Sequence, residues 1–269
     1  MTQGQDDIRK HYGQTRIVER ILAALAETGE PTDRLAPEKL FPFDQLHGRE
    51  IVATREHVER LKLKDGMHVL DVGSGIGGPA RYIAAHHQAK VTGLDLTPEF
   101  VTAARELTRR CGMEDRVSFE QGNALTMPFP DNTFDAALCL YVGMNIEDKA
   151  GVAREIFRVL KPGGRLVWSE VAQGEAGPPH FPLPWARDPS TSFVKSPETL
   201  RRVFGEAGFR IVDWVDESPK FTAEGAAGGP PPSSNQVVMG EDFLERRQNF
   251  RRSFMEGRLL SFLVEAEKP

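Results

Sequence analysis

Residues 69–80 read VLDVGSGIGGPA, an apolar run of strand type that passes directly into a turn rich in glycine. Gly73, Gly75 and Gly78 have the spacing G-x-G-x-x-G, and Pro79 suits the first turn of a helix, where its missing N–H group is not needed. A strand, a glycine turn and a helix in this order are typical of an α/β sheet that holds a nucleotide at the helix N-terminus. The stretch therefore predicts an α/β fold that binds a ligand at the edge of the sheet where this turn lies.

The pattern around this turn predicts a mostly parallel sheet. From Met67 onward, short apolar runs alternate with helical stretches, as in sheets wound by right-handed crossovers. We expect strands at 68–72, 90–95, 116–121, 134–140, 165–171 and 209–215, and a last, antiparallel strand at 259–266. We expect helices near 78–87, 98–111, 147–159, 197–207 and 241–256.

The residues before this pattern predict a helical cap. Apolar residues recur at helical spacing in 15–27 and again in 50–62, and prolines interrupt the stretch between them. The Gly, Pro and Ser content of later segments indicates irregular structure. The predicted organisation is an N-terminal helical cap at 1–64 and an α/β domain at 65–269, with an insertion at 174–193 and a loop at 217–240.

Composition and charge narrow the classes of partner. The formal net charge is −5 and the basic residues form no long run, which argues against a nucleic-acid partner. The N-terminus has no apolar leader, and the longest nearly apolar run, 136–144, is too short to cross a bilayer. We therefore expect a cytoplasmic protein with no membrane span. Cys111 and Cys139 lack C-x-x-C spacing and a neighbouring histidine cluster, so no metal site is expected.

Two aspartates decide which nucleotide suits the turn. Asp71 stands two residues before Gly73, where a carboxylate would repel a pyrophosphate but attract an ammonium or a sulfonium. S-adenosylmethionine (SAM) carries both of these cations beside its ribose. Asp95 ends the second expected strand, about 20 residues after the turn, where an acidic side chain accepts hydrogen bonds from both ribose hydroxyls. Asp95 would serve SAM or a dinucleotide, whereas Asp71 favours SAM.

Three further residues complete a predicted nucleoside pocket. Leu96 follows Asp95 and would supply an apolar wall for the adenine ring. Asn123 and Ala124 follow the third expected strand and can meet the adenine edge through a side-chain carbonyl and a backbone N–H group. Ligands of open parallel sheets bind at this carboxyl edge, near the reversal of strand order. The same residues could instead serve a tight turn or a helix N-cap.

Four segments within 65–171 resemble successive motifs of the class I SAM-dependent methyltransferases: LDVGSGIGGPARYIA, VTGLDLTPE, GNALTMPFPDNTFDAALCL and FRVLKPGGRLVW. The resemblance implies a Rossmann-like sheet of seven strands with an antiparallel last strand, SAM as cofactor and S-adenosylhomocysteine (SAH) as product. It also implies that Gly73, Gly75 and Gly77 form the turn under the methionine moiety. Asp71 and the backbone of Leu140 would then bind its amino group.

The flanking segments carry a looser likeness. FPFDQLHGREIVATREHVE, LPWARDPSTSFVKSPETLRRVFGEAGF and VVMGEDFLERRQNFRRSFMEGRLL resemble bacterial small-molecule enzymes around the glycine, sarcosine and dimethylglycine N-methyltransferases. This likeness implies a small-molecule acceptor, preferably methylated at an amine nitrogen. C- or O-methylation of a quinol, phenol or isoprenoid-type acceptor is the alternative, because relatives that share a scaffold methylate different acceptors.

Candidate acceptor residues gather in the cap, after the fourth strand and in the insertion. An amine need only arrive neutral, whereas a phenol or carbon acid would need a base, for which His47 and His180 are the candidates. The planar guanidinium of Arg187 could bind a substrate carboxylate. The expected substrate pocket consists of Gln45, Tyr141, Asn145, Trp185 and Arg187.

Two other functions remain open from the sequence. An NAD(P)-dependent oxidoreductase could use the same glycine spacing, although the chain has no Tyr-x-x-x-Lys pair. A SAM-binding protein that transfers no methyl group is the second. A homo-oligomer also stays open, because the apolar helix at 15–27 could pack on its own domain or on another subunit.

Overall fold

The central strands of the sheet are buried almost along their whole length. The computed structural model describes residues 16–226 and 234–269, which form a seven-stranded sheet in the order β3-β2-β1-β4-β5-β7-β6. The strands are β1 (His68–Val72), β2 (Lys90–Asp95), β3 (Val117–Gln121), β4 (Phe134–Leu140), β5 (Leu160–Gln173), β6 (Arg210–Asp216) and β7 (Leu259–Glu267). β7 pairs antiparallel with β5 and β6, and the other pairs are parallel. The predicted fold class is confirmed.

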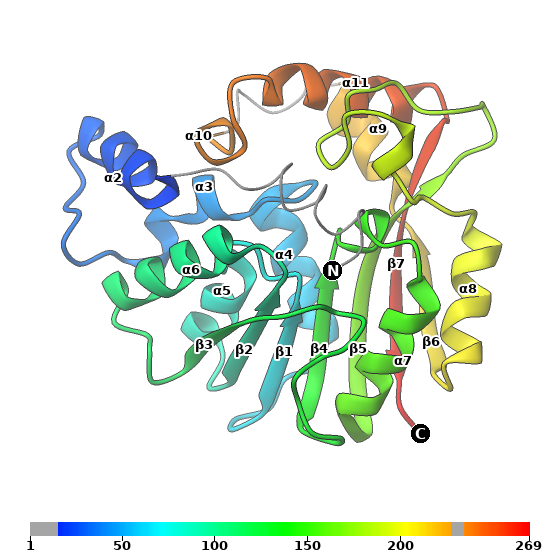
Figure 1. Ribbon diagram of the computed structural model, residues 1–269, viewed down its shortest axis with the longest axis horizontal. Coiled ribbons are helices and arrows are strands. Elements are labelled where there is room, and N and C mark those ends of the chain that lie inside the picture. Colours follow the sequence, from blue (N-terminus) through cyan, green and yellow to red (C-terminus); the bar gives the residue numbers. More distant parts are fainter. Residues whose placement is uncertain (1–15, 227–233) are drawn as a thin grey trace.

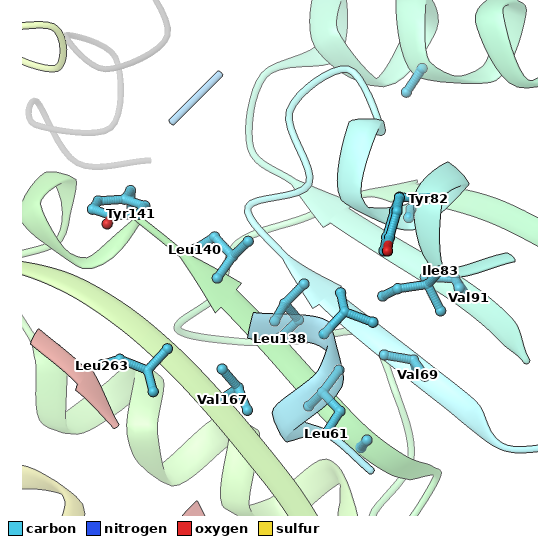
Figure 2. Packing of buried hydrophobic residues seen from close by; sticks show 14 of the residues in the cluster. Leu61, Val69, Tyr82, Ile83, Val91, Leu138, Leu140, Tyr141, Val167 and Leu263 are labelled. Carbon is cyan, nitrogen blue, oxygen red and sulfur yellow. The ribbon is translucent and has the colours of Figure 1, made fainter. Parts of the chain in front are cut away.

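Helices cover both faces of this sheet (Figure 1). On one face lie α4 (Glu50–Arg60), α5 (Gly78–His86) and α6 (Pro98–Arg110), and on the other lie α7 (Lys149–Val159) and α8 (Pro197–Glu206). Successive strand residues point to opposite faces, so Val69 joins the first core and Leu70 the second. Figure 2 shows part of the first core, where Leu61, Val69 and Leu138 pack together.

The first helix of the described chain packs on its own chain. Ile17, Ile21 and Leu25 of α2 (Ile17–Glu27) form a third core with Leu107 of α6 and Val238 of α10 (Gln236–Met239). This packing covers the apolar face that was considered for a second subunit. A turn of 3-10 helix, η1 (Pro37–Lys39), then leads to α3 (Phe41–Asp44). Of the predicted cap, residues 1–15 lie outside the described structure.

The prediction of a loop over 217–240 is wrong at both ends. α9 (Ser218–Ala226) and α10 occupy much of it, and residues 227–233 lie outside the described structure. The Asp216 carboxylate accepts a hydrogen bond from Ser218 N at 2.8 Å and so supports the start of α9. Phe221 then stacks on Phe254 of α11 (Phe243–Met255) with ring centroids 4.6 Å apart. This buried contact stabilises α9 although the Gly, Pro and Ser content of the segment favours a loop.

The boundary predicted at residue 64 stays a prediction. Val58, on α4 before that boundary, packs in the same core as Val69 after it. Figure 1 places α2, α3, α9, α10 and α11 beyond the carboxyl ends of the central strands. β5 is longer than expected, because it begins at Leu160 and includes the Pro162–Gly164 turn. Within 16–226 and 234–269, no helix has the length and apolar character needed to cross a membrane.

Candidate functional site

A cavity of about 590 Å³ lies at the carboxyl ends of β1, β2 and β4. This volume is within the range of small-molecule sites, and the strand order reverses here between β1 and β4. The cavity brings together most of the predicted site: Asp71, Gly73, Gly75, Asp95, Leu96, Asn123, Ala124 and Leu140 from the expected cofactor set, with His47, Tyr141 and Asn145 from the expected acceptor set. Their roles stay predictions.

Four N–H groups of the glycine turn donate hydrogen bonds within the chain. Gly73 N and Ser74 N donate to the Leu94 carbonyl oxygen at 2.7 and 3.1 Å, and Gly75 N donates to Asp95 Oδ2 at 2.8 Å. Gly77 N donates to Ser74 O at 2.9 Å. A pyrophosphate would have to displace these bonds to be held by the turn. Gly77 itself starts α5 with a φ of 85° and does not line the cavity.

The N-terminus of α5 is covered by protein. A Cβ atom added at Gly78 would collide with the Asp44 carbonyl oxygen and lie 2.6 Å from Gln45 Nε2. Asp44 Oδ2 accepts a bond from Arg81 Nη2 at 2.9 Å, and both side chains are buried. The end of α3 and the Gln45 that follows it are therefore packed over the helix end that a phosphate group would need.

The burial of two carboxyl groups in the cavity is not fully offset by hydrogen bonds or nearby positive charge. Asp71 is 2% exposed, and its Oδ2 has no hydrogen-bond partner. Burial, with a further contribution from Asp95, raises the pKa of Asp71 to about 7. Burial raises the pKa of Asp95 to about 6, against the opposing hydrogen bonds from Thr97 and Gly75. A cationic ligand would relieve both groups, because a nearby positive charge favours the ionised form.

The expected adenine end is formed by Leu96, Asn123 and Ala124. Asn123 Oδ1 already accepts a bond from Leu125 N at 2.9 Å, which closes a turn after β3. An amide oxygen has two lone pairs, so it can accept a second bond from a ligand.

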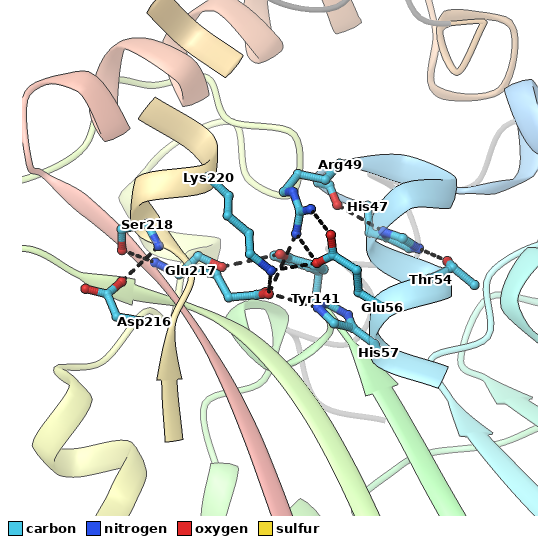
Figure 3. Close-up of polar contacts among 12 residues, drawn as sticks. His47, Arg49, Thr54, Glu56, His57, Tyr141, Asp216, Glu217, Ser218 and Lys220 are labelled. Atoms are coloured by element: carbon cyan, nitrogen blue, oxygen red, sulfur yellow. Dashed lines mark hydrogen bonds and ion pairs between the residues drawn. The ribbon is translucent and has the colours of Figure 1, made fainter. Parts of the chain in front are cut away.

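The opposite end of the cavity is aromatic. Tyr141 follows β4 with a φ of 55°, and its ring stacks on His47 with centroids 5.8 Å apart. His47 Nε2 lies 3.0 Å from Thr54 Oγ1 and Nδ1 lies 3.2 Å from Gly48 O, so both ring nitrogens have partners within the chain (Figure 3). Burial lowers the pKa of His47 to about 4, which makes the ring neutral at pH 7.

Several predicted acceptor residues lie outside the cavity lining. Gln45 is buried behind it, where its amide bonds Asp44 and Thr54. Trp185 is buried in the core, and its Nε1 donates to Ser192 at 3.0 Å. The other two are engaged at the surface: Arg187 pairs with Asp242 at 2.6 Å and His180 contacts Glu256 at 2.7 Å.

Sequence reasoning missed a polar network beside Tyr141 that links α4 to α9 (Figure 3). His57 Nε2 lies 3.0 Å from Glu217 Oε2, and Lys220 Nζ lies 2.8 Å from Glu217 Oε1. Burial raises the pKa of Glu217, but the bonds from His57 and Lys220 outweigh it and bring that pKa to about 2. Arg49 also pairs with Glu56 at 2.7 Å. No spacing in the sequence signals contacts between residues so far apart in the chain.

The cavity lining also includes residues that were not predicted, among them Asp44, Leu46 and Phe193. Asp44 and Leu46 flank the predicted Gln45, so the segment was found but the wrong residue was chosen. Phe193 closes the 174–193 insertion, and its N–H group donates to Met144 O at 2.9 Å.

Comparisons with known proteins match this geometry. Residues 70–168 match the family model described as a methyltransferase domain. The sterol 24-C-methyltransferase erg6 of Aspergillus fumigatus is 42% identical over 117 residues, which are 43% of this chain and 31% of that protein. A phosphoethanolamine N-methyltransferase of Triticum aestivum is 34% identical over 189 residues, which are 70% of this chain and 36% of that protein. The chain thus spans about a third of the length of these curated relatives.

Solved structures share the whole fold. The 4+2 cyclase SpnF is 26% identical with a TM-score of 0.65, covering 94% of this chain and 93% of that one. The geranyl diphosphate C-methyltransferase of Streptomyces coelicolor A3(2) has a TM-score of 0.74 at 20% identity, covering 100% of this chain and 99% of that one. A putative sarcosine dimethylglycine methyltransferase of Galdieria sulphuraria has a TM-score of 0.66 at 16% identity, covering 93% and 98%.

Proposed function

We propose that this chain is a class I SAM-dependent methyltransferase that transfers a methyl group from SAM to a small-molecule acceptor. The observation that carries the proposal is the buried Asp71 carboxylate, which lines the cavity with one oxygen unpartnered, while four N–H groups of the neighbouring turn are already engaged. A buried anion without a partner is costly, so the site favours a ligand that brings a positive charge. SAM carries a sulfonium and an ammonium and is a net cation, whereas a nicotinamide dinucleotide is a net anion because of its pyrophosphate.

The residues of the cavity fit the parts of SAM. Asp95 would accept hydrogen bonds from the ribose hydroxyls, and Asp71 with the Leu140 backbone would hold the methionine ammonium. Leu96, Asn123 and Ala124 would surround the adenine. SAM supplies a methyl group, which the acceptor lone pair takes as the carbon–sulfur bond breaks toward sulfur. The chain aligns the two partners and excludes water, which can supply much of the rate enhancement.

The preferred acceptor atom is an amine nitrogen, with carbon or oxygen as the alternative. The relatives named above methylate acceptors of different chemistry, so similarity alone does not choose among them. Tyr141 and Asn145 support an acceptor site at the aromatic end, because both line the cavity. A neutral amine needs no base for its attack, which agrees with the internal hydrogen bonds of His47.

A screen for methyl transfer tests the proposal. The full-length chain would be incubated with methyl-labelled SAM and separate pools of amines, phenols and isoprenoid alcohols, and the products analysed by mass spectrometry. We expect label to appear in one pool and SAH to accumulate with it. SAM binding without label transfer to any pool would count against methyl transfer. It would favour a role such as that of SpnF, the neighbour named as a cyclase, as the second candidate function.

SAM affinity should depend on pH. Burial raises the pKa of Asp71 to about 7 and that of Asp95 to about 6 in the ligand-free chain. As pH falls below these values the carboxyl groups take up protons. A cation binds only their ionised form, so its binding must then release those protons and becomes weaker. We expect the Kd to be nearly constant above pH 8 and to rise about tenfold per pH unit well below pH 6 for each proton released. Calorimetry between pH 5 and 9 measures this dependence, and a flat profile would contradict it.

A further inference from the structure

Acidic side chains dominate the charge of the cavity. Its lining includes five carboxyl groups and, among the described residues, no Lys or Arg: the acids are Asp44, Asp71, Asp95, Glu147 and Asp148. His47 also lines it, but both ring nitrogens are engaged by Thr54 and Gly48. The described walls therefore offer an entering anion no charged donor.

Three cations near the lining are paired with carboxylates. Arg81 contacts Asp44, Arg49 lies two residues from His47, and Lys149 follows Asp148 in the sequence. Their carboxylate partners are Asp44 for Arg81 at 2.9 Å, Glu56 for Arg49 at 2.7 Å and Glu170 for Lys149 at 3.7 Å. Lys149 Nζ also donates to Gly143 O at 2.6 Å. Recruiting Arg81 or Lys149 to an acceptor would leave the buried carboxylate of Asp44 or Glu170 uncompensated, which is strongly unfavourable.

Much of the remaining lining is apolar or aromatic. It includes Leu46, Phe100, Val142 and Phe193. A carboxylate or phosphate entering here would lose its hydration and meet no compensating charge.

From this distribution we infer that the acceptor is uncharged or cationic with an apolar body, and that carboxylate and phosphate acceptors are rejected. The inference rests on the proposed methyl transfer and narrows its substrate class. An amine that enters as an ammonium first releases a proton to water. Its nitrogen lone pair then forms the new bond to the methyl carbon, the carbon–sulfur electrons remain on sulfur, and the product leaves as an ammonium. The acidic walls favour that gain of positive charge on the acceptor.

A divalent cation could reverse the charge of the site for a phosphate acceptor, so the test includes one. Among residues 16–226 and 234–269, no group of three or more His, Cys, Asp or Glu side chains is arranged to hold a metal ion. We therefore expect Mg²⁺ to leave the rejection of phosphate unchanged.

Calorimetry with matched probes tests the inference. The full-length chain is first titrated with SAH, and the SAH complex is then titrated with octylamine, octanol, octanoate and octyl phosphate, each with and without Mg²⁺. We expect octylamine and octanol to bind at least tenfold more tightly than either anion. Equal or tighter binding of an anion, with or without Mg²⁺, would overturn the inference, as would failure of both favoured probes to bind. Failure of SAH itself to bind would instead overturn the proposed function.

A charge variant separates electrostatics from shape. Leu46 lines the cavity and is partly buried, so Leu46→Arg places a cation at the acceptor end. Its matched control is Leu46→Met, which keeps volume and removes no charge. We expect the ratio of the octanoate Kd to the octanol Kd to fall at least tenfold in Leu46→Arg and to stay unchanged in Leu46→Met. An unchanged preference in Leu46→Arg, with SAH binding retained, would show that charge does not set the discrimination.

Discussion

Replacing Asp95 with Ala is expected to weaken SAM binding by about 100-fold or more. The carboxylate lines the cavity at the end of β2, where it would accept bonds from both ribose hydroxyls. Each hydrogen bond to a charged group contributes about 1.5–3 kcal/mol, and each 1.4 kcal/mol is a factor of ten in Kd. The same carboxylate accepts bonds from Gly75 N and Thr97 N, both at 2.8 Å, so its loss also loosens the turn. Calorimetric titration with SAM measures the effect.

Glu147→Gln provides the matched control for Asp95→Ala. Glu147 lines the same cavity but is exposed, so its charge is well solvated. We expect its variant to bind SAM within about threefold of the unmodified chain, since an exposed charge contributes at most about 1 kcal/mol. Thermal unfolding without ligand would show whether either variant has lost its fold. A folded Asp95→Ala variant with unchanged SAM affinity would contradict the assigned role.

Replacing Arg81 with Met is expected to destabilise the chain by about 3–5 kcal/mol. The guanidinium is fully buried and bonds Asp44 Oδ2 at 2.9 Å, Ile76 O at 2.7 Å and Thr108 Oγ1 at 3.1 Å. Methionine leaves the Asp44 carboxylate buried without its counter-charge, and burial already raises the pKa of that carboxyl group. For a chain of this size the melting temperature should fall by about 10 °C. Differential scanning calorimetry measures this shift.

Two further variants show whether the lost charge pair is the cause. Arg202→Met removes an exposed arginine whose ion pair with Glu206 spans 3.3 Å at the surface of α8, and should change stability by no more than about 0.5 kcal/mol. Adding Asp44→Leu to Arg81→Met removes the stranded carboxylate and should recover at least about 1 kcal/mol. If the double variant is no more stable than Arg81→Met alone, the uncompensated charge is not what destabilises the chain.

Short-range patterns predicted the sheet closely. The expected strands at 68–72, 90–95 and 134–140 have the observed bounds, because a strand followed by a turn is encoded within a few residues. The position of the cavity was predicted from the same pattern, because parallel strands end together at one edge of the sheet. The loop predicted over 217–240 failed because composition was weighed alone, while the packing of Phe221 on Phe254 is a contact over 30 residues away in the chain.

The acceptor end was predicted less well because long-range contacts decide it. Asp44 meets Arg81, and His57 meets Glu217, across segments that the sequence gives no reason to pair. Arg187 was considered for binding a substrate carboxylate, yet the fold directs it to Asp242 at the surface. Tyr141 and Asn145 were placed correctly beside the cavity because they directly follow a strand whose end was known.

Parallel titrations of the full-length chain with SAM and NADH, at one pH near 8, test the central claim most directly. The buried carboxylate of Asp71, the half-buried carboxylate of Asp95 and the four engaged N–H groups of the turn predict SAM binding in the micromolar range usual for enzyme substrates. They predict NADH binding at least about 100-fold weaker, because its phosphates would meet carboxylates instead of free donors. Tight binding of NADH with none of SAM would contradict the account.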